Sequence, residues 1–220
     1  MFHHFHPYKP FLNKYTKRII VGTLPPPRFC TKEYKEKDVL FCYGSQDGLL
    51  WQALDKIFDL KLVYNRSDFA IDQRKDFLIK NRLGICDIVD SCQREKVDAS
   101  DIGMKDVLLR DILAYLKKYQ MIDTIIFTGG YCKNSPEYFL RKVLKEKNIK
   151  FEIVDENIPK VHKFEYDNRI FKTISLTSPS NAANRSIGAN PYYKEQKQKN
   201  KNYTTFDFRV EQYEKVFKSL

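Results

Sequence analysis

Residues 18–27 read RIIVGTLPPP, and this stretch decides the fold that the sequence predicts. Its first half is a short β-branched run that ends at Gly22, and residues 23–27 form a proline-rich loop. A short apolar run that is followed by glycine and proline is typical of a buried strand that ends in a stiff loop. The stretch therefore predicts a strand inside a sheet, with Gly22 at its carboxyl end.

Strand-like and helical patterns alternate along the rest of the chain. Further strands are expected at residues 84–89, 122–127, 150–154 and 170–176. Amphipathic helices are expected at residues 48–60, 67–81, 104–119, 135–146 and 205–217. This alternation predicts an α/β domain with a largely parallel sheet and helices on both of its faces.

Three of the predicted strands end in unusual loops. The loop 22–27 is rich in proline, the loop 127–130 reads FTGG, and the loop 177–185 reads TSPSNAANR. Ligands of parallel α/β sheets bind beyond the carboxyl ends of the strands. We therefore expect the three loops to surround one cavity that holds a ligand.

The charge of the chain favours a polyanionic partner. Its 220 residues include 39 Lys and Arg against 28 Asp and Glu, which gives a formal net charge of +11. Such an excess binds phosphate backbones by neutralising them and releasing counterions, which indicates nucleic acid. On charge alone, a lysine-rich surface that is merely solvated explains the excess equally well.

The length and the apolar content favour a single domain. With 42% hydrophobic and 14% aromatic residues, the chain has enough apolar surface for one substantial core. We expect one domain over residues 1–220, in which residues 1–16 form an N-terminal extension and residues 193–203 a basic loop. No apolar stretch reaches the roughly 18 residues of a membrane span, so we expect a cytoplasmic protein with no membrane partner.

The cysteines and histidines predict neither a metal site nor a cofactor. Five cysteines are scattered without a C-x-x-C pair, which predicts reduced, buried thiols. His3, His4 and His6 lie close together, but we expect them in a mobile N-terminal tail. We expect a monomer that uses no cofactor.

Five motifs occur in an order that resembles the uracil-DNA glycosylase superfamily. They are GTLPPP (22–27), CYGSQDGLLW (42–51), GICDIVDSCQRE (84–95), IIFTGG (125–130) and SLTSPSNA (175–182). The closest likeness is to the branch that includes the DNA-deoxyinosine (hypoxanthine) glycosylases. The resemblance spans residues 18–187, which is most of the chain.

This resemblance implies a three-layer α/β/α sandwich around a central, mainly parallel four-stranded sheet, with DNA lying across the carboxyl ends of the strands. Enzymes of the superfamily flip a damaged or deaminated base into a pocket and hydrolyse its N-glycosidic bond, which leaves an abasic site for base excision repair. They need oriented donors for the departing base and a placed water for the sugar C1′. They need no metal or organic cofactor.

The resemblance also implies which residues form the base pocket. They are Gly22, Thr23, Leu24, Pro25, Tyr43, Gly48 and Thr128. Gly22 would permit close approach of the backbone, and the three residues after it would form the floor of the pocket. Tyr43 would stack on the flipped base, although a half-buried core tyrosine is an equally good interpretation.

The serine-rich loop is where the resemblance places the DNA backbone. Ser178 and Ser180 would donate to phosphate oxygens, Asn181 with the two alanines after it would wedge toward the vacated base stack, and Arg185 would hold the strand. The small polar side chains of this loop suit such close contact with phosphates. The alternative is a Ser/Pro turn that caps a short helix.

Four positions depart from the pattern of the superfamily. Gly48 stands where the branch has its asparagine, Leu24 where other branches keep an Asn or Asp, Thr128 at the Asn of N-G, and Pro26 at the second glycine of the first motif. Three expected polar groups are therefore absent. The smaller side chain at Gly48 also enlarges the expected pocket.

A neighbouring carboxylate is the candidate to replace the missing asparagine. The expected catalytic residues are Asp47 and Thr23. Asp47 would orient or deprotonate the water and would stabilise the positive charge that develops on the sugar. The alternative for Asp47 is an Asx N-cap on the helix that is expected to begin at Gly48. Asp87 and Asp90 are further candidates, but we expect them to pair with backbone groups or basic neighbours.

The leading interpretation is a monofunctional DNA glycosylase that acts on a deaminated or modified base, in single- or double-stranded DNA. Because Gly48 leaves room, we expect a purine or another large base rather than uracil. A catalytically silent DNA-binding member of the superfamily is the first alternative, favoured by the missing asparagines. A nucleoside hydrolase is the second, and the +11 charge and Arg185 weigh against it.

Overall fold

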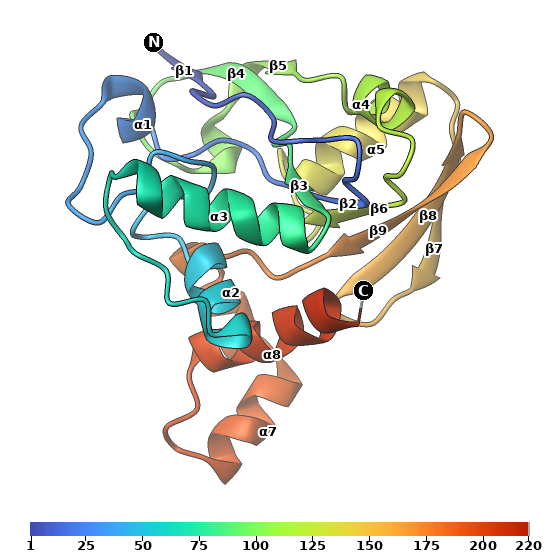
Figure 1. Ribbon diagram of the computed structural model, residues 1–220. Helices are drawn as coiled ribbons and strands as arrows, with labels where there is room; N and C mark the ends of the chain where they lie inside the picture. Colours follow the sequence, from blue (N-terminus) through green and yellow to red (C-terminus); the bar gives the residue numbers. More distant parts are fainter. Residues whose placement is uncertain (220) are drawn as a thin grey trace.

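The computed structural model describes residues 1–219, and a six-stranded sheet lies at its centre (Figure 1). The strands lie in the order β3 (Leu83–Ile85), β2 (Arg18–Val21), β6 (Thr124–Phe127), β9 (Arg169–Ser175), β8 (Lys160–Tyr166) and β7 (Phe151–Asp155). The first four run parallel, whereas β8 and β7 each pair antiparallel with the strand before them in this order. The mainly parallel α/β sheet is confirmed. The expected number of four strands is wrong, because the hairpin of β7 and β8 extends the parallel core.

The central strands are parallel and buried because both of their faces are apolar. Ile20 of β2 and Ile126 of β6 point to one face of the sheet. Ile19 and Val21 of β2 and Ile125 of β6 point to the other, and all five side chains are fully buried. Strands covered on both faces carry such continuous β-branched runs.

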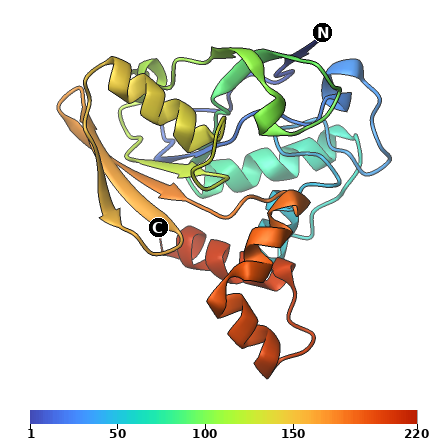
Figure 2. The same cartoon turned by 180° about the vertical axis from the view of Figure 1, so that it is seen from behind.

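Helices cover one face of the sheet, and helices together with a second sheet cover the other (Figures 1 and 2). The first face carries α2 (Leu50–Phe58), α3 (Asp68–Lys80) and α8 (Thr205–Lys218). The opposite face carries α4 (Ile112–Lys118) and α5 (Pro136–Glu146). The helices expected at residues 48–60, 67–81, 135–146 and 205–217 are confirmed as α2, α3, α5 and α8.

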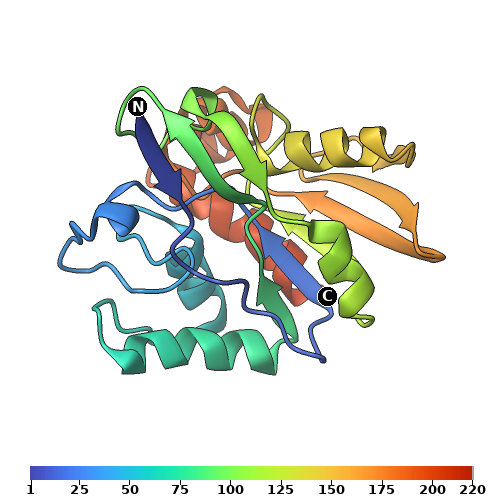
Figure 3. The same ribbon diagram turned by 90° about the horizontal axis from the view of Figure 1, so that it is seen from above.

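The second sheet was not expected. It is antiparallel, with β4 (Val89–Arg94) between β1 (Phe2–Phe5) and β5 (Lys105–Leu109), and Figure 3 shows β1 running beside β4. The helix predicted at residues 104–119 is wrong for its first half, which is β5, and only the second half is helical as α4. The strand predicted at 84–89 is two strands, β3 and β4, separated by residues 86–88.

Two predictions about polar segments are also wrong. The N-terminal histidines do not lie in a mobile tail, because β1 is paired with β4 along its whole length. The basic loop predicted at residues 193–203 is mostly α7 (Pro191–Lys199), which follows α6 (Asn184–Ala189). Asn190 caps α7 by accepting from two backbone N–H groups, and α7 protrudes beside α8 (Figure 2).

The remaining elements are short: α1 (Arg28–Thr31), the 3₁₀ turn η1 (Asp101–Gly103) and the 3₁₀ turn η2 (Asn181–Ala183). Among residues 1–219, no helix has both the length and the apolar character needed to cross a membrane.

Candidate functional site

The carboxyl ends of three parallel strands lie side by side, as the loop pattern predicted. Val21 of β2 is paired with Phe127 of β6, which is paired with Ser175 of β9. The next residues continue the ladder, because the Thr128 N–H donates to the Val21 carbonyl at 3.0 Å. The loops that begin at Gly22, Thr128 and Leu176 therefore leave the same edge of the sheet.

The Asp87 carboxylate joins four distant segments at this edge. It lies just beyond β3, is 5% exposed, and accepts three hydrogen bonds. The Gly22 N–H and the Tyr43 hydroxyl donate to Oδ1 at 2.7 and 2.8 Å, and His6 Nε2 donates to Oδ2 at 2.8 Å. Hydrogen bonds to an ionised carboxylate are among the strong ones. The expectation that Asp87 pairs with backbone and basic neighbours is confirmed, and we call this group the Asp87 cluster.

Gly22 is required here for steric reasons. A Cβ atom at this position would lie 2.2 Å from Tyr43 Oη and 2.9 Å from both Asp87 Oδ1 and Thr128 Oγ1. The Tyr43 hydroxyl lies 3.0 Å from Thr128 Oγ1, so these groups are packed against one another. A close approach to the backbone was predicted at Gly22, and the side chains of Tyr43, Asp87 and Thr128 make it.

Tyr43 adopts a strained backbone conformation to reach this position. Its φ is 57°, in the left-handed region, which costs a non-glycine residue about 1–2 kcal/mol. Burial and the Asp87 charge raise the pKa of its hydroxyl well above the usual range, so the group stays a donor. The residue is half-buried, and its hydroxyl end is fixed by Asp87 and Thr128.

His6 is the part of the cluster that the sequence did not predict. Its Nδ1 accepts the Tyr8 N–H at 3.2 Å, which leaves Nε2 to carry the proton that is donated to Asp87. His4 and His6 are buried while His3 and Phe5 are exposed. This alternation of burial is that of a strand with polar residues on its inward face, but residues 2–6 read FHHFH, which does not alternate between apolar and polar residues and so gave no strand signal.

His6→Ala should lower the free energy of unfolding by about 1–3 kcal/mol, because a buried carboxylate loses one of its donors. His6→Gln, which can still donate, should recover part of that loss. Urea denaturation measures both, and the exposed His3→Ala is the matched control, expected within about 0.5 kcal/mol of the parent. Equal losses for His3→Ala and His6→Ala would contradict the role of the hydrogen bond.

A second carboxylate, Asp101, lies against the loop that follows β2. The Thr23 hydroxyl donates to Asp101 Oδ1 at 2.7 Å. The Asp101 carbonyl accepts from the Asn134 amide at 2.9 Å, so the loop after β6 holds η1 in place. Burial raises the pKa of Asp101 to about 6. Asp101 was not predicted from the sequence, because its partners lie 78 and 33 positions away.

Asp47 lies outside the Asp87 cluster. Its side chain is 46% exposed, and its Oδ2 lies 2.7 Å from Lys35 Nζ and 3.1 Å from Arg28 Nη2. It is not the N-cap of α2, because that helix begins at Leu50 and its N-cap is Leu49. Asp90 pairs with a basic neighbour as expected, through Arg110 Nε at 3.1 Å.

The serine-rich turn lies beside the segment that carries Gly48. The Leu49 N–H donates to the Pro179 carbonyl at 2.9 Å. Ser180 accepts from the Ala182 N–H and so caps η2, which matches the structural alternative for this turn. Ser180, Asn181 and Arg185 are exposed, and Ser178 is half-buried.

Arg209 of α8 fixes the backbone of this turn through hydrogen bonds. Its side chain is fully buried and donates to the carbonyls of Ser178 and Ser180 at 2.9 and 2.8 Å. A third bond runs to the Thr205 carbonyl at 3.1 Å. This role could not be predicted from the sequence, because an arginine within an amphipathic helix is usually solvated.

The other residues expected in the base pocket are Leu24, Pro25 and Gly48. Leu24 and Pro25 are half-buried, and Leu24 packs on the core cluster between the sheet and α5. The Gly48 N–H donates to the Ser45 carbonyl at 3.0 Å, and a Cβ at Gly48 would lie 3.3 Å from that oxygen. An asparagine would therefore fit there after a small shift.

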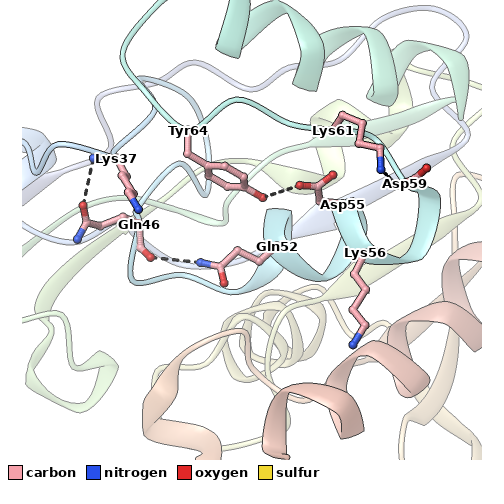
Figure 4. Close-up of a pocket in the computed structure, with 8 residues that line it drawn as sticks. All are labelled: Lys37, Gln46, Gln52, Asp55, Lys56, Asp59, Lys61 and Tyr64. Carbon is pink, nitrogen blue, oxygen red and sulfur yellow. Dashed lines mark hydrogen bonds and ion pairs between the residues drawn. The ribbon is translucent and has the colours of Figure 1, made fainter.

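The three loops leave one edge of the sheet as expected, and the single cavity expected among them stays a prediction. A surface cavity of about 670 Å³ lies beside α2 (Figure 4). Its lining residues are Lys37, Gln46, Gln52, Asp55, Lys56, Asp59, Lys61 and Tyr64. At the Gly22 edge, the Tyr43 side chain occupies the space against the backbone.

Comparison with known proteins rests on one solved structure. No protein-family model and no curated protein matches the sequence. The solution NMR structure of a putative uracil DNA glycosylase from Methanosarcina acetivorans is similar over 94% of this chain and 98% of that chain, with a TM-score of 0.53 and 18% identity. The two chains therefore share a fold.

Proposed function

We propose that this chain is a DNA glycosylase of the uracil-DNA glycosylase superfamily, which flips a deaminated or modified base and hydrolyses its N-glycosidic bond. One observation carries the proposal: Gly22, Tyr43, Asp87 and Thr128 come from four motifs and meet at the carboxyl edge of the sheet. Ligands of this fold class bind at that edge. The fold shared with the Methanosarcina protein is consistent with it.

Tyr43 is the proposed stacking platform for the flipped base. Stacking of a base on an aromatic ring contributes roughly 1–3 kcal/mol. Because the hydroxyl is already held by Asp87 and Thr128, the ring loses little rotational freedom when a base binds.

The serine-rich turn is the proposed contact with the DNA backbone. Its carbonyls are fixed by Arg209, which leaves the exposed side chains of Ser180, Asn181 and Arg185 free to face phosphates. The net charge of +11 supplies the long-range attraction, so binding should weaken steeply as salt rises.

The proposed substrate is a purine or another large base rather than uracil. Gly48 takes the place of an asparagine in the motif, and the backbone there has room for a side chain. The space an asparagine would fill is then free for a larger base.

The experiment is a cleavage panel on single- and double-stranded oligonucleotides that contain uracil, hypoxanthine, xanthine or modified cytosines. We expect alkali-labile sites at a purine or modified base, and at least a tenfold slower reaction for Tyr43→Ala. Tyr15→Ala, at an exposed tyrosine, is the matched control. Lesion binding without any alkali-labile product would indicate a silent DNA-binding protein, and salt-insensitive cleavage of a free nucleoside would indicate a nucleoside hydrolase.

A further inference from the structure

Hydrolysis of an N-glycosidic bond needs a group that accepts a proton from water, and three carboxylates lie on the segments that form this site. This inference rests on the proposed glycosylase function. Asp87 already accepts three hydrogen bonds and is only 5% exposed, so its oxygens are occupied. Asp47 is exposed and paired with two cations, Arg28 and Lys35, and lies outside the Asp87 cluster.

Asp101 differs from both in its surroundings. Within residues 1–219, the Thr23 hydroxyl is the one side chain that donates to its carboxylate, which leaves lone pairs free. The residue is half-buried, so a water molecule can reach it. Thr23 directly follows Gly22, and the hydrogen bond between Thr23 and Asp101 therefore places this carboxylate next to the Asp87 cluster.

The backbone of Asp101 is fixed on both sides. Asn134, which is buried in the loop after β6, donates to its carbonyl at 2.9 Å. Arg94 of β4, which is 1% exposed, donates to the carbonyl of Ser100, the preceding residue. A carboxylate held in this way needs little reorganisation to act on a water molecule.

We propose that Asp101 is the base that activates the attacking water, and that the Thr23 hydroxyl orients its carboxylate. The water oxygen forms a bond to C1′, and the N-glycosidic bond breaks with its electron pair going to the base. Asp101 takes the proton from the water and passes it to the departing base or to solvent. The products are the free base and an abasic sugar, and the carboxylate is restored.

The charges around Asp101 suit this role. Burial raises its pKa to about 6, while the Thr23 hydrogen bond and the Arg94 charge oppose the rise and the Asp87 charge adds to it. Cys132 also faces Asp101, and burial raises the pKa of that thiol, so it stays neutral. Asp101 is therefore ionised at neutral pH and is a stronger base than an ordinary carboxylate.

The test uses the full-length protein in single-turnover cleavage of the best substrate from the panel. Asp101→Asn should slow cleavage at least about a hundredfold, the range expected for loss of a general base. Its affinity for the same DNA with a non-hydrolysable 2′-fluoro sugar should stay within about threefold of the parent. Asp106→Asn, at an exposed position in the same region, is the matched control and should cleave at the parent rate.

Two readouts separate catalysis from a structural role. The parent rate should fall about tenfold per pH unit below pH 6, and the residual activity of Asp101→Asn should lack that inflection. Added formate should restore part of the activity of Asp101→Ala, because it supplies the missing carboxylate.

The outcomes separate this inference from the proposed function. A parent protein that cleaves no base overturns both. A parent that cleaves, together with an Asp101→Asn variant that is equally fast, overturns only the role of Asp101. Loss of activity in Asp47→Asn with full activity in Asp101→Asn would assign the water to Asp47.

Discussion

Gly22→Ala should reduce base cleavage at least about a hundredfold and lower the free energy of unfolding by about 2–4 kcal/mol. The new methyl group would lie 2.2 Å from Tyr43 Oη, a distance that no packing tolerates. Tyr43 must then move away, which breaks its bonds to Asp87 and Thr128. The proposed platform for the base and one donor to a buried carboxylate are lost together.

A double-mutant cycle with Tyr43→Phe isolates this clash. Phenylalanine lacks the hydroxyl, so Gly22→Ala should cost less stability in the Tyr43→Phe background than in the parent. Urea denaturation and single-turnover cleavage measure the cycle. Gly188→Ala is the control, because a Cβ there meets open space. Strictly additive effects at Gly22 and Tyr43 would show that the two side chains do not compete for the same volume.

Arg209→Leu should lower the free energy of unfolding by about 2–4 kcal/mol and weaken DNA binding at least about tenfold. The leucine fills much of the space but removes the guanidinium that donates to the carbonyls of Ser178 and Ser180, and the Ser180 carbonyl keeps only the Ala183 N–H. The serine-rich turn then loses the fixed shape that we propose for phosphate contact. Arg209→Lys should be intermediate, because an ammonium group cannot reach both carbonyls with the same planar geometry.

Urea denaturation and fluorescence anisotropy with lesion-bearing DNA at two salt concentrations measure these effects. Arg66→Leu, at an exposed arginine, is the control and should change stability by less than about 0.5 kcal/mol. If Arg209→Leu destabilises the protein but binds DNA as the parent does, the serine-rich turn is not the DNA contact.

The parallel core could be predicted because its signal is local. Residues 19–21 of β2 and 125–127 of β6 are continuously apolar, and a glycine follows each run within two residues, so both the strands and their loops follow from a few neighbouring residues. β5 was missed because the apolar residues of KDVLL fit the spacing of a helix that continues into α4. α7 was missed because it has no buried residues, and only the cap at Asn190 marked its start.

The site could be predicted only where the residues lie in ordered motifs. Gly22, Tyr43 and Thr128 were expected to line one base pocket; they lie against one another, and their binding of a base stays a prediction. His6 and Arg209 act through partners that are 81 and about 30 positions away, and no local pattern marks such pairs. The cationic partners of Asp47 could not be predicted for the same reason. The course of the loop between Lys35 and Asp47 brings the two side chains together, and no local pattern marks that course.

The bond between His6 and Asp87 has a consequence for synthesis. The acceptor lies 81 positions after the histidine in the chain, so it leaves the ribosome later. At roughly 5–20 residues per second, a nascent chain spends several seconds without this contact. The hydrogen bond between Tyr43 and Thr128 forms later still, because Thr128 must first leave the ribosome. The edge of the sheet can therefore close only after Thr128 has been translated.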